Sequence, residues 1–173
     1  MAAFDTVVLG GGPGGYVSAI RAAQLGNKTA IIDQDRLGGI CLNWGCIPTK
    51  ALLKSAEILH YIKNSGGYGI KVPKYDIDFD QTIKRSRDIS FNLSKGIEFL
   101  MKKNKIKHIV GKGMLNSKSE IIVADGKKKQ KVQAKKIIIA TGGRAKKFAG
   151  IEFDSKNIIS SKEAMVILSL IHI

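Results

Sequence analysis

Short apolar runs alternate with longer amphipathic stretches in the first part of the chain. Residues 5–9 form a short apolar, β-branched run, and residues 16–26 then carry apolar side chains at helical spacing. A second apolar run, 28–32, follows this stretch. Continuous apolar runs of this length are typical of strands buried in a parallel sheet. The order of strand, helix and strand therefore predicts a β-α-β unit at the beginning of the chain.

The same pattern predicts further elements along the rest of the chain. A helix follows the second cysteine and is expected to end near Lys63, because glycines and short polar residues interrupt the pattern there. The remaining expected elements are a long helix over 79–103, a strand over 106–110, short antiparallel strands within 114–133, and a strand over 136–140. The apolar faces expected of the long helix are formed by Ile83, Ile89, Phe91, Leu93, Ile97, Phe99, Leu100 and Met101. Strands that alternate with helices indicate the α/β class.

A glycine-rich turn lies between the first expected strand and the first expected helix. Gly10, Gly12 and Gly15 fit G-x-G-x-x-G, in which the glycines allow a tight turn, close approach to a pyrophosphate and helix packing. Asp33 ends the second strand 18 residues after Gly15, where an acidic side chain can accept a hydrogen bond from a ribose 2′-hydroxyl. A glycine-rich loop of an unrelated α/β protein and a turn-capping role for Asp33 are the alternatives.

The chain has two cysteines, Cys41 and Cys46, which are five positions apart. Asn43 and Gly45 permit the tight backbone that a disulfide between them needs. Pro48 suits the first turn of the following helix, so Cys46 is expected near a helix N-terminus, where partial positive charge favours a thiolate. A redox-active pair and two buried structural cysteines both fit this spacing, which alone does not separate them.

Composition narrows the class of protein further. At 173 residues with 44% apolar content the chain suffices for one globular domain, and it has no apolar run long enough for a transmembrane helix. The net charge of +15 comes from 24 Lys and 5 Arg, without the interleaved aromatics and arginines that nucleic-acid binding favours. We therefore expect no nucleic-acid partner, no membrane partner and no metal site. Only Met1 to Phe4 precede the first strand, so no signal peptide and a cytoplasmic location are expected.

The residues around the cysteines resemble the redox-active segment of the pyridine nucleotide-disulfide oxidoreductases, and look most like the lipoamide dehydrogenase branch. The resemblance rests on Leu42, Ile47 and the run 49–53, and on an A-T-G segment at 140–142. It covers Phe4 to about Ala164. Ile40 departs from it, because threonine usually precedes the first cysteine, and a hydroxyl that could face the flavin phosphates is missing.

The resemblance implies an α/β, Rossmann-like FAD-binding domain with a parallel sheet and a small antiparallel β layer. FAD would lie with its ADP end on the glycine turn and its ring against the disulfide. Cys46 would be the charge-transfer thiolate and Cys41 the interchange thiol. The cofactor-binding candidates are Gly10, Gly12, Pro13, Gly14, Gly15, Asp33, Gly39, Lys50, Thr141 and Gly142. A solvated lysine at Lys50 and a tight strand exit at Thr141-Gly142 are the alternatives for those positions.

The activity implied by the resemblance is oxidation of dihydrolipoamide, with NAD as the final acceptor. The implied partners are lipoamide on 2-oxoacid dehydrogenase complexes and a second copy in a homodimer. The sequence has no second G-x-G-x-x-G for NAD, and His60, His108 and His172 lie outside any matching motif for the base. We therefore expect the N-terminal part of such an enzyme, inactive alone. Another disulfide or metal-ion reductase of the family and a non-catalytic flavin-binding module are the alternatives.

The last residues do not fit the family pattern. We expect the FAD-binding domain to extend over 1–164 and interpret 165–173 as a tail. The final six residues, 168–173, are Leu-Ser-Leu-Ile-His-Ile, an apolar end that gains nothing from exposure. The codons CTG TCT CTT ATA CAC ATC, a transposon end used in library adapters, would encode them. We interpret this end as a scar of library preparation, and native residues are the alternative.

Overall fold

The computed structural model describes residues 2–167, which fall into two compact units. The first unit consists of Met1–Asn43 and Asn92–Arg144. The second consists of Trp44–Phe91 and Ala145–Ile173. The six residues interpreted as a scar lie outside the described residues, and the boundary expected after Ala164 stays a prediction.

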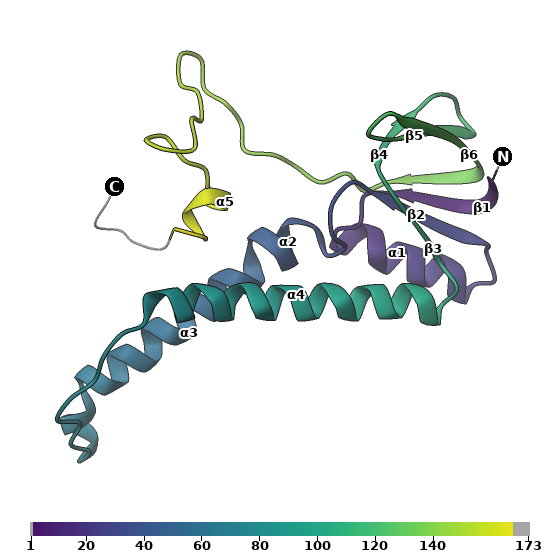
Figure 1. Ribbon diagram of the computed structural model, residues 1–173. Helices are drawn as coiled ribbons and strands as arrows, with labels where there is room; N and C mark the ends of the chain where they lie inside the picture. Colours follow the sequence, from purple (N-terminus) through teal and green to yellow (C-terminus); the bar gives the residue numbers. More distant parts are fainter. Residues whose placement is uncertain (1, 168–173) are drawn as a thin grey trace. The chain divides into compact units, whose positions relative to one another are not determined.

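A six-stranded sheet forms the body of the first unit (Figure 1). Its strands are β1 (Ala2–Leu9), β2 (Thr29–Asp33), β3 (Lys107–Val110), β4 (Lys112–Leu115), β5 (Glu120–Asp125) and β6 (Lys128–Ile139), in the order β3-β2-β1-β6-β5-β4. The pairs β3-β2, β2-β1 and β1-β6 are parallel, whereas β6-β5 and β5-β4 are antiparallel. The expected α/β class, with a parallel sheet and a smaller antiparallel part, is confirmed.

Strand β6 belongs to both parts of the sheet. Its first residues pair antiparallel with β5, and its residues from Val132 to Ile139 pair parallel with β1. The sequence pattern predicted two separate segments here, because lysines interrupt the apolar run. They form one strand since the backbone has a partner along its whole length, whatever the side chains are.

Three of the described α-helices correspond to predicted helices, whereas Gly39–Trp44 and Ser161–Ala164 are short helices that the sequence pattern did not predict. The helices are α1 (Pro13–Gln24), α2 (Gly39–Trp44), α3 (Cys46–Lys63), α4 (Phe79–Lys103) and α5 (Ser161–Ala164), with a 3-10 turn η1 (Ser65–Tyr68) after α3. The expected end of α3 at Lys63 and the expected span of α4 are confirmed. Helix α1 lies against β1 and β2 (Figure 1). None of the described helices is long and apolar enough to cross a membrane.

A cluster of buried apolar side chains from the sheet forms the core of the first unit. Its buried side chains come from β1, β2, β3, β5 and β6 and are Val7, Leu9, Ala30, Ile32, Ile109, Ile121, Val123, Val132 and Ala134. The short apolar runs at 5–9 and 28–32 therefore are buried strands, as their pattern predicted.

Helix α4 buries only some of its expected apolar residues, namely Ile83, Ile97 and Met101. Phe91, Leu93 and Phe99 are 38%, 44% and 64% exposed, whereas three serines are almost fully buried. The hydroxyls of these serines, Ser86, Ser90 and Ser94, donate to the carbonyls of Ile83, Ser86 and Leu37. Serines whose hydroxyls form hydrogen bonds of their own can be buried alongside apolar residues at little cost.

Candidate functional site: a glycine turn, a strand-end cavity and a thiol at a helix N-terminus

The turn from β1 to α1 requires glycine at two positions. Gly10 has a φ of +99°, and a Cβ there would lie 2.2 Å from the carbonyl oxygen of Ala140. A Cβ on Gly15 would lie 1.8 Å from the carbonyl oxygen of Gly10. These contacts reproduce the roles expected of the first and third glycines, a sharp turn and close helix packing.

Gly12 and Gly14 have open space where a side chain would begin. A Cβ on Gly12 would have no neighbour nearer than the Cα of Gly39 at 3.7 Å, and one on Gly14 would have none within 4 Å. Packing within the protein therefore does not require glycine at either position. Open space beside the backbone is what a bound pyrophosphate would need here.

The N-terminus of α1 is open to an anion. Its N-cap residue, Gly12, makes no side-chain capping bond, and its first turn has no acidic residue. Pro13 occupies the first turn, where its missing N–H costs no helical hydrogen bond. The partial positive charge of this helix end is thus not compensated by its own first turn.

The loop before α2 lies against the glycine turn. The N–H of Gly38 donates to the carbonyl of Gly11 at 2.8 Å. Gly39 has a φ of +60°, and a Cβ on it would lie 2.6 Å from the Cα of Gly12. Gly39, a predicted cofactor-binding residue, is therefore next to the second glycine of the motif.

Asn43 holds this loop in place. Its buried side-chain amide donates to the carbonyls of Arg36, Leu37 and Gly39 at 3.1–3.3 Å. The hydroxyl of Ser94 donates to the carbonyl of Leu37 at 2.7 Å. Asn43 was expected to allow a tight backbone for a disulfide, which stays a prediction; in the structure it belongs to α2 and holds the segment next to Gly12.

Asp33 lies at the end of β2, beside the glycine turn. Its Oδ2 accepts the N–H of Gly11, and its Oδ1 accepts the N–H of Asp35 at 2.8 Å. The predicted placement is confirmed, because β1 and β2 pair in parallel and Asp33 ends the second strand. The bond to Asp35 is the turn-capping role that was the alternative. Carboxylate oxygens keep further acceptor capacity, so the ribose role stays a prediction.

A cavity of about 150 Å³ opens where the parallel strands end. Three predicted residues, Gly10, Asp33 and Thr141, line it. Three polar side chains that sequence analysis missed line it as well, namely Gln34, Lys112 and Arg144. Such strand ends are where ligands of open α/β sheets bind.

The missed residues had weak sequence signals. Lys112 lies between two glycines and is the first residue of β4, and Arg144 follows the A-T-G segment. Gly142 in that segment has a φ of +68° with no atom near a Cβ, so its backbone conformation favours glycine. Lys50 is exposed in α3 of the second unit, and its cofactor role stays a prediction.

Cys46 is the first residue of α3, as predicted. The N-cap residue Gly45 makes no side-chain capping bond, and the first turn of α3 has no acidic residue. Pro48 is buried within that first turn. Cys41 belongs to α2 and is partly buried, whereas Cys46 is exposed. Both are thiols in this structure, so the disulfide between them stays a prediction.

Neither of the two described histidines lines the cavity at the strand ends. His108 is half-buried in β3, and burial lowers its pKa below 6.5 while the charges of Glu98 and Asp33 oppose the shift. His60 is exposed near the end of α3, where its ring lies 3.4 Å from the side-chain nitrogen of Asn64. Among residues 2–167, no group of three or more metal-ligating side chains is close enough to hold an ion.

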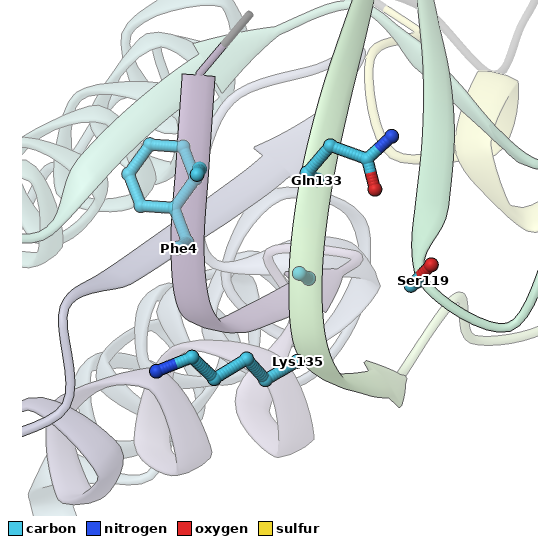
Figure 2. Close-up of a pocket in the computed structure, with 6 residues that line it drawn as sticks. Phe4, Ser119, Gln133 and Lys135 are labelled. Atoms are coloured by element: carbon cyan, nitrogen blue, oxygen red, sulfur yellow. The ribbon is translucent and has the colours of Figure 1, made fainter.

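A second cavity of about 280 Å³ lies on the sheet (Figure 2). Phe4, Ser119, Gln133 and Lys135 line it, together with two alanines. The ammonium of Lys135 pairs with Asp5 at 2.8 Å, which lowers the pKa of that carboxyl. This cavity is larger than the one at the strand ends, but it contains none of the predicted site residues.

Comparisons with known proteins agree with these features. A family model described as pyridine nucleotide-disulphide oxidoreductase matches residues 4–167. A dihydrolipoyl dehydrogenase of Zymomonas mobilis is 48% identical over 163 residues, 94% of this chain and 35% of the relative. One of Bacillus subtilis is 39% identical, covering 94% of this chain and 36% of the relative. A leghemoglobin reductase of Vigna unguiculata is 45% identical, covering 96% and 32%. The chain thus spans about a third of the length of these relatives.

Proposed function

The chain belongs to the pyridine nucleotide-disulphide oxidoreductase family, and we propose that it forms the FAD-binding, cysteine-bearing part of a dihydrolipoyl dehydrogenase. The observation that carries this proposal is the single cavity at the strand ends, which brings Gly10, Asp33 and Thr141 together beside the glycine turn. The names of relatives at 39–48% identity support the choice of enzyme within the family.

The residues of the first unit fit FAD. The open space at Gly12 and Gly14 and the uncompensated N-terminus of α1 suit a pyrophosphate. Asp33 offers acceptor oxygens for a ribose, and the cavity beside it suits an adenosine. Lys112 and Arg144 add positive charge at the cavity for a doubly charged cofactor.

The cysteines would carry the exchange with substrate. Bound FAD would supply an acceptor for the electron pair of the reduced cysteines, with NAD as the proposed final acceptor. A thiolate of dihydrolipoamide attacks the Sγ of Cys41 and breaks the disulfide, and the electron pair of that bond leaves on the Sγ of Cys46. The positive end of α3, which begins at Cys46, favours the negative charge on that sulfur.

The second step releases the product. The second substrate thiol loses its proton to a base and attacks the substrate sulfur of the mixed disulfide. The ring of oxidised lipoamide closes, and Cys41 leaves as a thiolate. Neither His60 nor His108 is suited to be that base, since His60 lies toward the far end of α3 and His108 is part of the sheet. The family resemblance assigns it to a His-Glu pair of a partner subunit.

A second candidate keeps the family and changes the substrate. The relative named leghemoglobin reductase is as similar to this chain as several dihydrolipoyl dehydrogenases, so similarity alone does not fix the substrate. NAD as acceptor, pairing into a homodimer, association with 2-oxoacid dehydrogenase complexes and a cytoplasmic location remain parts of the proposal. A polypeptide of only these 173 residues should lack NAD-linked turnover, since it contains one G-x-G-x-x-G.

Cofactor titration tests the proposal directly. The purified chain should quench the fluorescence of FAD and bind FMN much more weakly, because FMN lacks the ADP half that the glycine turn would hold. ADP should compete with FAD. Equal affinity for FAD and FMN, or no binding of either, would refute the FAD assignment. Faster reduction of the cysteines by dihydrolipoamide than by glutathione would favour the first candidate over the second.

A further inference from the structure

Two cations lie against the ring of Trp44, the chain's one tryptophan. The guanidinium carbon of Arg87 is 4.6 Å from the ring centroid. The ammonium of Lys162 is 4.5 Å from the same centroid. Trp44 ends α2, Arg87 belongs to α4 and Lys162 to α5, and all three lie in the second unit. Three segments far apart in the sequence therefore meet at one side chain.

The segment that carries Lys162 is held by a capping box. The hydroxyl of Ser160 accepts the N–H of Lys162 at 3.2 Å, and Glu163 accepts the N–H of Ser160 at 2.8 Å. The Ser160 hydroxyl also donates to Glu163, and these hydrogen bonds lower the pKa of that carboxyl. The backbone of Lys162 is thus fixed before its side chain reaches the ring.

The other cation is carried by a helix that is tied to α3. Arg85 of α4 donates from its guanidinium to the carbonyl of Ala51 in α3 at 3.0 Å. Arg87 follows two positions later on the same helix. The contact of Arg87 with Trp44 therefore connects the segment before α3 to a helix that is already hydrogen-bonded to α3.

The link between Trp44 and Cys46 has a flexible backbone. Gly45 is the only residue between them, and glycine has the most backbone freedom of any residue. The N-terminus of α3 has no side-chain cap. Buried Pro48 holds the first turn of α3 itself, and the Trp44 ring can hold the chain just before it.

We propose that Arg87 and Lys162 are positioning residues, which hold the Trp44 ring and so limit the movement of the segment that leads into Cys46. This inference rests on the proposed function, in which Cys41 and Cys46 form a disulfide. Holding one thiol before the bond forms reduces the conformational entropy lost in forming it. The stack should therefore make the disulfide more stable.

The test measures that stability in the 173-residue chain. The chain is equilibrated with reduced and oxidised dithiothreitol, and the remaining thiols are alkylated and counted by mass. Cys41 and Cys46 lose two electrons and two protons as their S–S bond forms, and dithiothreitol disulfide gains both as its own bond breaks. Arg87→Gln and Lys162→Gln should each lower the equilibrium constant for the protein disulfide about threefold to tenfold, which is about 15–30 mV at 29.6 mV per tenfold.

Matched variants separate the stack from general effects. Lys146→Gln removes an exposed lysine of the same unit and should leave the equilibrium constant unchanged. Trp44→Phe, Arg87→Lys and Lys162→Arg keep a ring or a cation and should retain most of the wild-type value. Trp44→Leu keeps an apolar side chain without a π face and should behave like the glutamine variants. If one glutamine variant fails to fold, these other variants still test the proposal.

Three outcomes would overturn the proposal. Unchanged equilibrium constants in both glutamine variants would show that the stack does not act on the disulfide. A more stable disulfide in those variants would show that the cations act by stabilising a thiolate. A wild-type chain that folds and binds FAD but forms no Cys41–Cys46 disulfide would refute the redox pair of the proposed function, and the stack's role with it.

Discussion

The backbone N–H of Gly11 donates to Oδ2 of Asp33, and this bond joins the glycine turn to the end of the neighbouring strand. The second oxygen of the carboxylate accepts the N–H of Asp35. One side chain therefore fixes both the turn and the start of the next loop. The proposed ribose contact would use acceptor capacity that these two bonds leave on the same carboxylate.

Asp33→Asn should weaken the turn and the cofactor site together. An asparagine can turn its oxygen toward only one of the two N–H groups and presents its own N–H₂ to the other. The expected loss of folding stability is about 1–3 kcal/mol, the cost of leaving one donor unpaired, measured by urea unfolding without FAD. The loss in free energy of FAD binding should exceed the loss in free energy of unfolding. An Asp33→Asn variant that binds FAD as tightly as wild type would contradict the ribose role. Asp35→Asn, which keeps the backbone N–H that bonds to Asp33, is the matched control.

Gly12→Ala and Gly15→Ala should fail in different ways. The added methyl group of Gly12→Ala meets only ordinary contacts, so the fold should persist, but it would occupy the space proposed for the pyrophosphate. FAD affinity should fall about tenfold or more, since one hydrogen bond to a charged group contributes about 1.5–3 kcal/mol. Gly15→Ala places its Cβ on the Gly10 carbonyl and should lower the melting temperature even without FAD.

The comparison of Gly12→Ala with Gly15→Ala needs a control glycine that has no proposed role. A Cβ on Gly66 in η1 would have no neighbour within 4 Å, so Gly66→Ala should change neither stability nor FAD affinity appreciably. Loss of FAD binding in Gly66→Ala equal to that in Gly12→Ala would remove the argument for a phosphate at Gly12.

The elements that the sequence predicted correctly are those whose signals are local. The glycine turn, the strand that ends at Asp33 and the span of α4 each follow from residues within a few positions of one another. Cys46 at the start of α3 likewise follows from Pro48 and the apolar spacing after it. Local backbone preferences and apolar periodicity are enough for such elements.

What the sequence could not predict depends on partners far away in the chain. Strand β6 continues through its lysines because β5 and β1 pair with it on either side. Lys112 and Arg144 line the same cavity although they are 32 positions apart, and Lys112 is placed there because Gly111 before it donates to the carbonyl of Asp33. The buried serines of α4 donate to backbone carbonyls, in one case to that of Leu37, 57 positions away, which apolar periodicity does not reveal.

Replacement of each cysteine should separate the two proposed roles. In the FAD-loaded protein that supports turnover, Cys41→Ser should retain a Cys46 thiolate and its long-wavelength absorption with the oxidised flavin. Cys46→Ser should abolish that absorption, because only the inner sulfur is proposed to contact the ring. Both variants should lose turnover. The long-wavelength absorption of each variant is recorded at neutral pH with the flavin oxidised. A band in Cys46→Ser but not in Cys41→Ser would reverse the assignment.

His108 should make the stability of the chain depend on pH just below neutrality. Its Nε2 is buried with no hydrogen-bond partner among residues 2–167, and burial lowers its pKa below 6.5 despite Glu98 and Asp33. The folded protein therefore binds a proton less readily than the unfolded chain. The stability contributed by neutral His108 is full above the unfolded pKa of 6.5 and is lost as the pH falls below it.

His108→Leu should remove this pH dependence. Leucine replaces an unpaired buried polar atom with apolar surface, so the variant should be at least as stable as wild type at low pH. Urea unfolding at several values between about pH 7 and pH 5 should give a steeper fall for wild type than for His108→Leu. His60→Gln removes an exposed histidine and should keep the wild-type slope. The carboxyls of Asp154 and Glu163, whose pKa values are lowered by their hydrogen bonds, contribute only at more acidic pH and do so in all three proteins. Parallel curves for wild type and His108→Leu would show that the buried imidazole does not set this dependence.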